Sequence, residues 1–187
     1  MERETLAERL NPDPPKKLRR GPWTLPLAVA TVGGIGYLRP APGTWAAAAA
    51  IGAGIALHGI GHFPLLLAAA VVAAFAGFWA CGRVLRDRPG EDPAEVVIDE
   101  VAGQWLALCF PSAGFWLMGL DSWHFPYPGW VAAFLFFRLF DIWKPGPIGR
   151  ADRRNDGAGI MLDDLLAGLF AGVATMVAAG IAHGLFM

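Results

Sequence analysis

The chain has 187 residues, of which 55% are hydrophobic and only 17% are charged. Soluble domains average about 25% charged residues. Here the apolar residues also gather in long blocks, which favours a membrane protein over a soluble one. The net charge of −1 gives no basis for nucleic-acid binding. Cys81 and Cys109 lie in or beside apolar stretches without CxxC spacing, which argues against a zinc site and a disulfide framework.

The predicted elements follow the apolar blocks in chain order. Residues 1–22 read as a polar cytoplasmic tail, whose basic cluster at 16–20 is of the kind that lies against anionic headgroups. The apolar segment 24–36 is too short to span a bilayer, which takes about 20 residues, and is predicted to be re-entrant or interfacial. Five transmembrane helices are then predicted, at residues 44–60, 63–82, 101–120, 129–143 and 160–187. The sequence therefore predicts an all-α integral membrane protein with one transmembrane domain over residues 23–187.

The lysine and arginine residues predict the orientation. All 15 fall in the tail, in the Pro-Gly loop near residue 39, after the second span, near the end of the fourth span, or before the fifth. The two opposite loops and the C-terminal end hold none. Because cytoplasmic loops carry the excess of Lys and Arg, the N-terminus and the charged loops are predicted to be cytoplasmic. The four histidines fall on the opposite side: His58, His62, His124 and His183.

Three acidic clusters adjoin the apolar segments on the predicted cytoplasmic side. They are Asp99-Glu100 in the third span region, Asp141 near the end of the fourth, and Asp163-Asp164 at the start of the fifth. An ionised carboxylate at a helix centre in hydrocarbon costs on the order of 3 kcal/mol, so these side chains are expected to face a polar cavity, pair with a base or bind a metal. Carboxylate oxygens suit a hard ion such as Mg²⁺. With Arg and Lys nearby to bind phosphate, the pattern indicates metal-assisted phosphoryl chemistry.

Simpler interpretations of the same residues stay open. Asp163 and Asp164 could favour the N-terminal dipole of their helix, as could the acids of the third span. Arg138 and Asp141, at i and i+3, could form a plain intrahelical ion pair. Residues 39–44 are either a membrane-surface turn or a loop that presents an arginine and a threonine hydroxyl to a phosphate.

The sequence contains no pattern typical of the other phosphatase classes. A cysteine phosphatase needs an arginine six positions after its nucleophile, but Asp87 stands there after Cys81. The histidines lie across the predicted membrane from the bases, and no Walker A motif is present. Water activated by a metal is therefore the simplest mechanism.

Four motifs occur along the chain in a fixed order. They read GYLRPAPGTW at 36–45, VIDEVAGQ at 97–104, FRLFDIWKPGPI at 137–148 and GIMLDDLLAG at 159–168. Together they resemble the phosphatidylglycerophosphatase A family over about residues 24–185. Residues 155–157 depart from the family pattern, which often has a His or Lys and two glycines there.

The resemblance implies a multi-pass phosphatase of the bacterial inner membrane that requires Mg²⁺ and works on the cytoplasmic side. Its substrate would be phosphatidylglycerol phosphate, which it would convert to phosphatidylglycerol and inorganic phosphate. The expected metal ligands are Glu100, Asp141, Asp163 and Asp164. Asp99 would be a further ligand or the general base. The expected catalytic residues are Asp99, Glu100, Asp152 and Asp163. Asp152 would orient Arg153 or protonate the leaving alkoxide.

The phosphate itself is expected to be bound by basic and hydroxyl side chains from three segments: Arg39, Thr44, Arg138, Lys144 and Arg153. Water and an aspartate that forms an aspartyl phosphate both remain possible nucleophiles. An ion- or proton-coupled transporter is an alternative function, with the acids as a relay. A non-catalytic lipid-binding protein is another.

Overall fold

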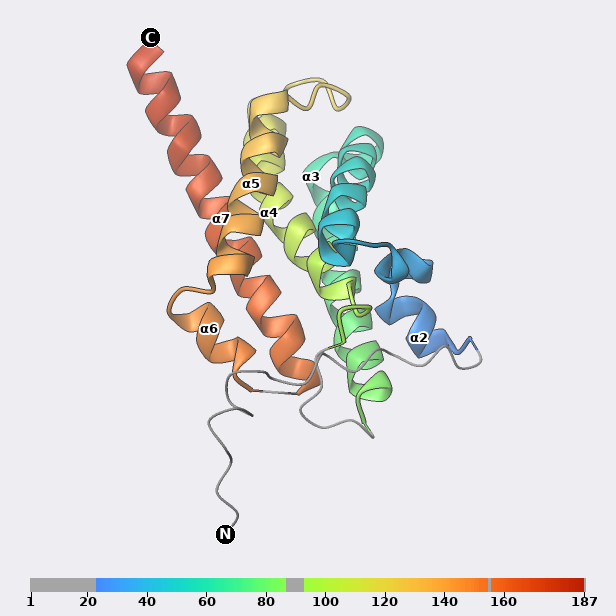
Figure 1. The fold of residues 1–187 in the computed structure, drawn as a ribbon. Coiled ribbons are helices and arrows are strands. Elements are labelled where there is room, and N and C mark those ends of the chain that lie inside the picture. Colours follow the sequence, from blue (N-terminus) through green and yellow to red (C-terminus); the bar gives the residue numbers. More distant parts are fainter. Residues whose placement is uncertain (1–22, 87–92, 155, 187) are drawn as a thin grey trace.

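The structure, a computed structural model, describes residues 23–86, 93–154 and 156–186. The basic cluster at residues 16–20 lies outside this part of the chain. The helices are α2 (Leu25–Ala30), the 3₁₀ helix η1 (Val32–Tyr37), α3 (Pro42–Val84), α4 (Ile98–Leu117), α5 (Tyr127–Trp143), α6 (Pro147–Asp152) and α7 (Gly157–Phe186) (Figure 1). The described residues contain no strand, so the predicted all-α class is confirmed.

Helix α3 reverses direction at His62, where φ is 55° and ψ is −158°, outside the helical range. Its two ends lie at the same end of the molecule, because Gly43 faces Glu100 and Gly77 faces Ile98, both in the first turn of α4. The reversal falls between two of the predicted spans, so α3 contains both of them.

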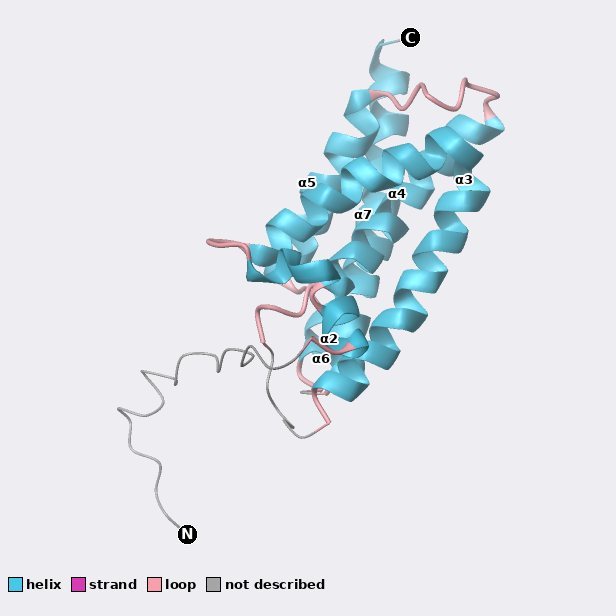
Figure 2. Cartoon of the chain, turned by 90° about the vertical axis from the view of Figure 1, so that its right-hand side faces the viewer, coloured by secondary structure: helices cyan, strands magenta, loops and turns pink. Residues whose placement is uncertain are grey.

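The long helices form an elongated bundle, with α2 and α6 near the end from which α4 and α7 begin (Figure 2). Local chemistry fixes several helix ends. Asp156 caps α7 by accepting a hydrogen bond from the Gly159 N–H at 2.6 Å. Helix α5 ends at Trp143, because the next residue, Lys144, has a left-handed backbone (φ 48°, ψ 53°) and Pro145 follows it. Short α6 was not predicted, because it begins at Pro147 directly after Pro145 and Gly146, and these three residues read as a loop.

Helix α4 packs mainly against α3 and α7. It approaches α7 closely through small residues, since Gly103 faces the backbone of Asp164, and Gly168 in turn faces the backbone of Gly103. This contact brings the second turn of α7 against the beginning of α4. The acidic residues of both helices are therefore held at the same level.

Gly103→Ala is expected to destabilise the bundle. A Cβ at this position would lie 2.5 Å from the backbone oxygen of Asp164, so α4 and α7 must separate. Overpacking of this kind costs about 1–3 kcal/mol of unfolding free energy. The matched control is Gly52→Ala, because a Cβ there meets nothing within 4 Å and alanine favours a helix. Thermal unfolding in detergent should show a lower Tm than wild type for Gly103→Ala but not for Gly52→Ala. A wild-type Tm for Gly103→Ala would contradict the close contact.

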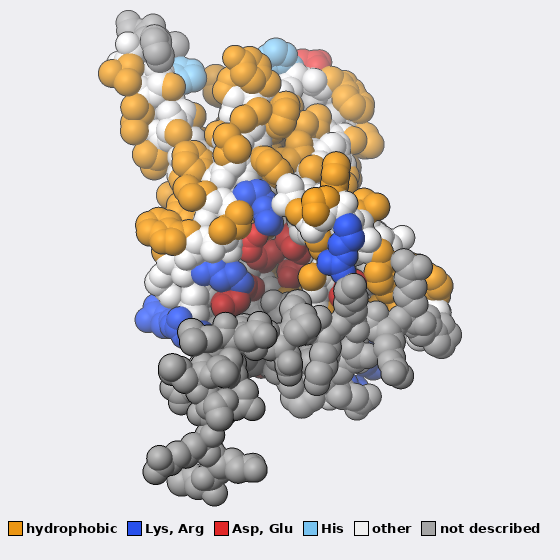
Figure 3. Space-filling view, in the orientation of Figure 1, with side chains coloured by type: hydrophobic (Ala, Val, Ile, Leu, Met, Phe, Trp, Pro, Cys, Tyr) orange, Lys and Arg blue, Asp and Glu red, His pale blue; other side chains and the backbone are white. Residues whose placement is uncertain are grey.

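Two helical segments among the described residues, α3 and residues 157–185 of α7, are long and apolar enough to cross a membrane. By this measure the predicted count of five spans is not confirmed. Large apolar side chains are nevertheless exposed along several helices, including Phe75 (73%), Ile142 (73%) and Val177 (56%). Figure 3 shows apolar side chains spread over much of one face. Such surface is unusual for a soluble monomer and agrees with a membrane protein.

Candidate active site

The three acidic clusters meet in one cavity of about 250 Å³. Its walls come from the start of α3, the segment before α4, the first turn of α4, the end of α5 and the second turn of α7. The charged residues that line it are Asp99, Glu100, Asp141, Asp163, Asp164, Arg138 and Lys144. In Figure 3 acidic side chains lie between basic ones well below the histidines. The structure thus brings together the acids that the sequence places on three different helices.

Asp99, Glu100 and Asp164 form the tightest group in this cavity. Each offers a carboxylate oxygen within 4.8 Å of the others. Asp99 and Asp164 are buried, and Glu100 Oε2 is enclosed without a hydrogen-bond partner. Gly43 of α3 makes room for this group, since a Cβ there would collide with the Glu100 carboxylate. Oxygen donors so close together are a suitable ligand set for a small hard cation.

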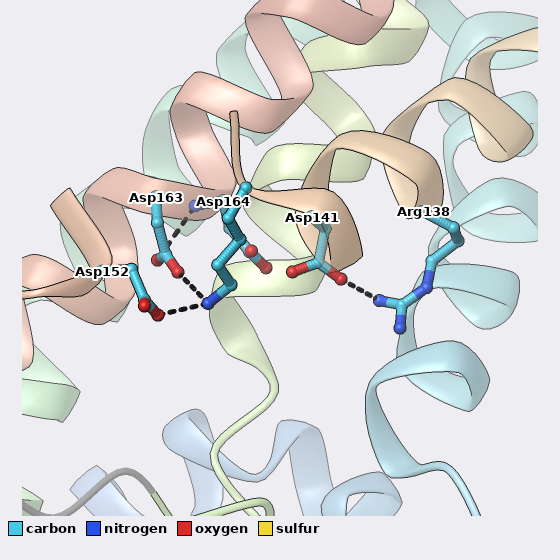
Figure 4. A network of polar contacts seen from close by, with 6 residues as sticks. Arg138, Asp141, Asp152, Asp163 and Asp164 are labelled. Atoms are coloured by element: carbon cyan, nitrogen blue, oxygen red, sulfur yellow. Dashed lines mark hydrogen bonds and ion pairs between the residues drawn. The ribbon is translucent and has the colours of Figure 1, made fainter. Parts of the chain in front are cut away.

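Asp141 and Asp163 line the same cavity but are paired with bases (Figure 4). Arg138 contacts Asp141 at 2.5 Å, so the intrahelical ion pair considered from the sequence does form. Lys144 Nζ donates to Asp163 Oδ2 at 2.7 Å and also to Asp152 Oδ1. The three acids nearest to one another therefore include two of the four predicted metal ligands, together with Asp99. The metal roles of all these residues stay predictions.

Lys144 joins the end of α5 to α6 and α7. Burial alone would lower the pKa of its ammonium, but the hydrogen bonds to Asp152 and Asp163 outweigh burial and raise the pKa above the usual lysine value. Lys144 therefore keeps its positive charge at neutral pH. Within the part of the chain that the structure describes, Lys144 and Arg138 are the cations that line the cavity.

The charges that line the cavity do not balance. Among the described residues, five carboxylates and two bases line it, so a phosphate dianion would meet an excess of negative charge there. Like charges at this spacing repel strongly unless a cation joins them. The donor set and the charge excess both fit a divalent cation.

The helix-dipole interpretation of Asp163 and Asp164 is wrong, because α7 begins at Gly157 and has no acid in its first turn. The dipole effect fades beyond the first turn. The acids of α4 do lie in its first turn, so the same interpretation stays open for Asp99 and Glu100.

The predicted phosphate-binding residues do not all reach the cavity. Thr44 lines it, as Arg138 and Lys144 do, but Arg39 and Arg153 are absent from its walls. Asp152 is not in the walls either. It accepts a hydrogen bond from Lys144, whereas the prediction had it orient Arg153 or protonate the leaving alkoxide.

Sequence reasoning missed Glu95. This residue is only 3% exposed and accepts a hydrogen bond at 2.9 Å from Arg39 Nη2. Its one sequence signal was an acid next to the apolar run Val96-Val97-Ile98.

The histidines are absent from the cavity walls, in agreement with their predicted separation from the acids. His58 forms a 2.7 Å hydrogen bond with Ser112 Oγ, and its ring packs against His62 and Phe125. His58 and His62 therefore belong to the packing near the reversal of α3.

A model of the family described as phosphatidylglycerophosphatase A matches residues 28–179. The chain belongs to this family. Curated relatives agree in part on the substrate: a Haemophilus influenzae phosphatidylglycerophosphatase A is 34% identical over 78% of this chain and 84% of its own length. An Escherichia coli protein of the same name is 36% identical over 50% of this chain and 48% of its own length.

A third relative carries a different substrate in its name. This Bacteroides thetaiotaomicron protein, provisionally named a phosphatidylinositol-3-phosphatase, is 37% identical over 84% of this chain and 95% of its own length. No solved structure matches the chain. Both names describe phosphatases of a phospholipid, and a cavity lined by carboxylates and bases suits phosphoryl chemistry.

Proposed function

We propose that this chain is a Mg²⁺-dependent phosphatase that removes the terminal phosphate of phosphatidylglycerol phosphate. One observation carries the proposal: carboxylates from α4, α5 and α7 converge on a single cavity in a member of the phosphatidylglycerophosphatase A family. Phosphatidylglycerol and inorganic phosphate are the products. The Mg²⁺ requirement rests on the ligand types and on the charge excess.

Asp99, Glu100 and Asp164 are the residues that would hold the ion, with Asp141 and Asp163 close by. Bound Mg²⁺ would supply Lewis-acid polarisation of the phosphoryl group and a lowered pKa for water. The protein positions the headgroup around that centre. Arg138 and Lys144 offset the charge of the phosphate, and the Thr44 hydroxyl is available as a hydrogen-bond donor.

Lys144 would also stabilise the leaving alkoxide, since it lines the cavity and carries a positive charge. Asp152 serves this step by holding the Lys144 ammonium in position. The attacking group is water or one of the aspartates. Radiolabelled phosphate trapped on acid-quenched enzyme would decide for the aspartate, and an absence of label during turnover would decide for water.

In the membrane we propose five crossings: the two arms of α3, then α4, α5 and α7. The exposed apolar side chains of these helices and the reversal at His62 support this count. The cavity lies at the end where α4 begins, near the segments rich in Lys and Arg, and those segments favour the cytoplasmic side of a bacterial inner membrane. Segment α2–η1 would be interfacial, because α2 and η1 have only six residues each.

A transport relay needs acids along the path across the membrane. Asp99 and Glu100 lie in the first turn of α4, and Asp141 lies two residues before the end of α5. The acids therefore cluster at one end of the bundle, which favours the phosphatase over the transporter.

Phosphate release by the purified protein from phosphatidylglycerol phosphate is expected with Mg²⁺ and not with excess EDTA. Adding Mg²⁺ back beyond the EDTA should restore it. Phosphatidylinositol 3-phosphate in a parallel assay would show which relative's name describes this chain. No release from phosphatidylglycerol phosphate with Mg²⁺ present would overturn the proposal, and full activity in EDTA would overturn its metal.

A further inference from the structure

We infer that Arg39, held in place by the buried Glu95, binds the phosphodiester of the lipid substrate and not the phosphate that is removed. The inference rests on the proposed function and deepens it. It assigns Arg39 to a second phosphate subsite at the rim of the cavity, and it makes Glu95 a positioning residue.

The place of the pair follows from its chain neighbours. Arg39 lies two residues before Ala41, which lines the cavity, so their Cα atoms are at most about 7.6 Å apart. Glu95 lies between Ala94 and Val96, and both of these also line the cavity. Neither Arg39 nor Glu95 is itself in the wall. The pair therefore lies at the rim, next to the walls but outside them.

The two side chains differ in burial in a way that would hold the Arg39 guanidinium in one position for binding. The Glu95 side chain is 4% exposed, whereas that of Arg39 is 50% exposed. The 2.9 Å hydrogen bond anchors one nitrogen of the guanidinium, and half of the side chain remains open to a ligand. A guanidinium oriented by a buried carboxylate loses less freedom on binding a phosphate than a mobile surface arginine does.

The apolar surface next to Arg39 identifies the ligand. Leu38 is 49% exposed and Trp45 is 50% exposed, so apolar side chains flank the rim. In phosphatidylglycerol phosphate the phosphodiester lies between the acyl chains and the terminal phosphate. If the acyl chains lie against this apolar surface and the terminal phosphate enters the cavity, the phosphodiester lies next to Arg39. Phosphatidylinositol 3-phosphate shares this phosphodiester, so the subsite does not depend on which headgroup is used.

A purely structural role for the pair is the competing explanation. It could simply join two loops, since Gly36 also faces the backbone of Glu95 and the Val97 N–H donates to the Ala30 carbonyl. A structural role would change stability and would affect all ligands alike. A subsite changes only ligands that carry the phosphodiester.

The test compares Arg39→Met, Glu95→Gln and the double variant with the wild type, in mixed micelles with Mg²⁺. The measured quantities are KM and kcat for phosphatidylglycerol phosphate and the competitive inhibition constant of inorganic phosphate. Arg39→Met should raise KM about tenfold, the effect of losing one charge-assisted hydrogen bond. It should leave kcat and the inhibition constant of phosphate within twofold.

Glu95→Gln should raise KM by a smaller factor, and the double variant should be no worse than Arg39→Met, because Glu95 acts through Arg39. The double variant also removes the buried negative charge that Arg39 offsets, so it remains informative if Arg39→Met fails to fold. Arg154→Met is the control, as Arg154 forms an exposed ion pair with Asp156 away from the cavity walls.

If Arg39→Met raised the inhibition constant of inorganic phosphate by the same factor as KM, Arg39 would bind the phosphate that is removed. That result would overturn the inference. An unchanged KM would overturn it as well. A wild-type protein that releases no phosphate refutes the proposed function instead, so the two failures are distinguishable.

Discussion

Asp164→Asn is expected to abolish Mg²⁺-dependent phosphate release while making the metal-free protein more stable. Asp164 is 4% exposed and shares the tight group with Asp99 and Glu100, so its charge is useful only when a cation is bound. Loss of a ligand should lower kcat/KM by about 10³-fold, since several kcal/mol of charge stabilisation are lost and each 1.36 kcal/mol is tenfold. Without metal, removing one of several adjacent negative charges relieves repulsion and should raise Tm.

The measurement is thermal unfolding in EDTA and in rising Mg²⁺, together with phosphate release. Wild-type protein should gain Tm with Mg²⁺, because a ligand that binds only the folded state stabilises it. Asp164→Asn should have a higher Tm than the wild type in EDTA, and its Tm should rise little with Mg²⁺. Asp156→Asn is the matched control, since Asp156 is half-exposed, caps α7 and is absent from the cavity walls. A lower Tm for Asp164→Asn in EDTA would show that this carboxylate serves the fold and would contradict the metal site.

The sequence predicted those features that depend on local pattern. Apolar blocks place the helices, so the reversal of α3 and the ranges of α4, α5 and α7 agree with the predicted spans to within a few residues. The acids beside those blocks were expected to converge, because a charge next to lipid needs a polar partner or an ion. Their convergence on one cavity follows from the same physical reason.

What the sequence could not predict depends on pairings between distant residues. Glu95 and Arg39 are 56 positions apart, and no local signal shows that a carboxylate in the loop before α4 becomes buried against an arginine. Likewise, the spacing of acids along the chain does not show which of them bases will neutralise. Lys144 reaches Asp163 only because the left-handed end of α5 directs the chain towards α6 and α7.

Lys144→Met is expected to reduce both stability and activity. Its ammonium joins Asp152 of α6 and Asp163 of α7, and Asp163 would be left buried without its cation. Removing one partner of a buried pair costs about 3–5 kcal/mol. The cost here should be nearer 1–3 kcal/mol, because the Lys144 and Asp152 side chains are 29% and 40% exposed and solvent screens them. Phosphate release should fall about 100-fold with the loss of one cation from the cavity.

The double variant Lys144→Met/Asp163→Asn separates the two effects. Removing both charges of the pair should recover most of the lost Tm, because no buried carboxylate is then left unpaired at this position. Activity should stay low, since the cation that faces the phosphate is still missing. Arg154→Met should change Tm little, as its ion pair with Asp156 is about half exposed on both sides. If the double variant recovered activity along with Tm, Lys144 would act only by stabilising the junction of α5, α6 and α7, and its place beside the leaving group would be refuted.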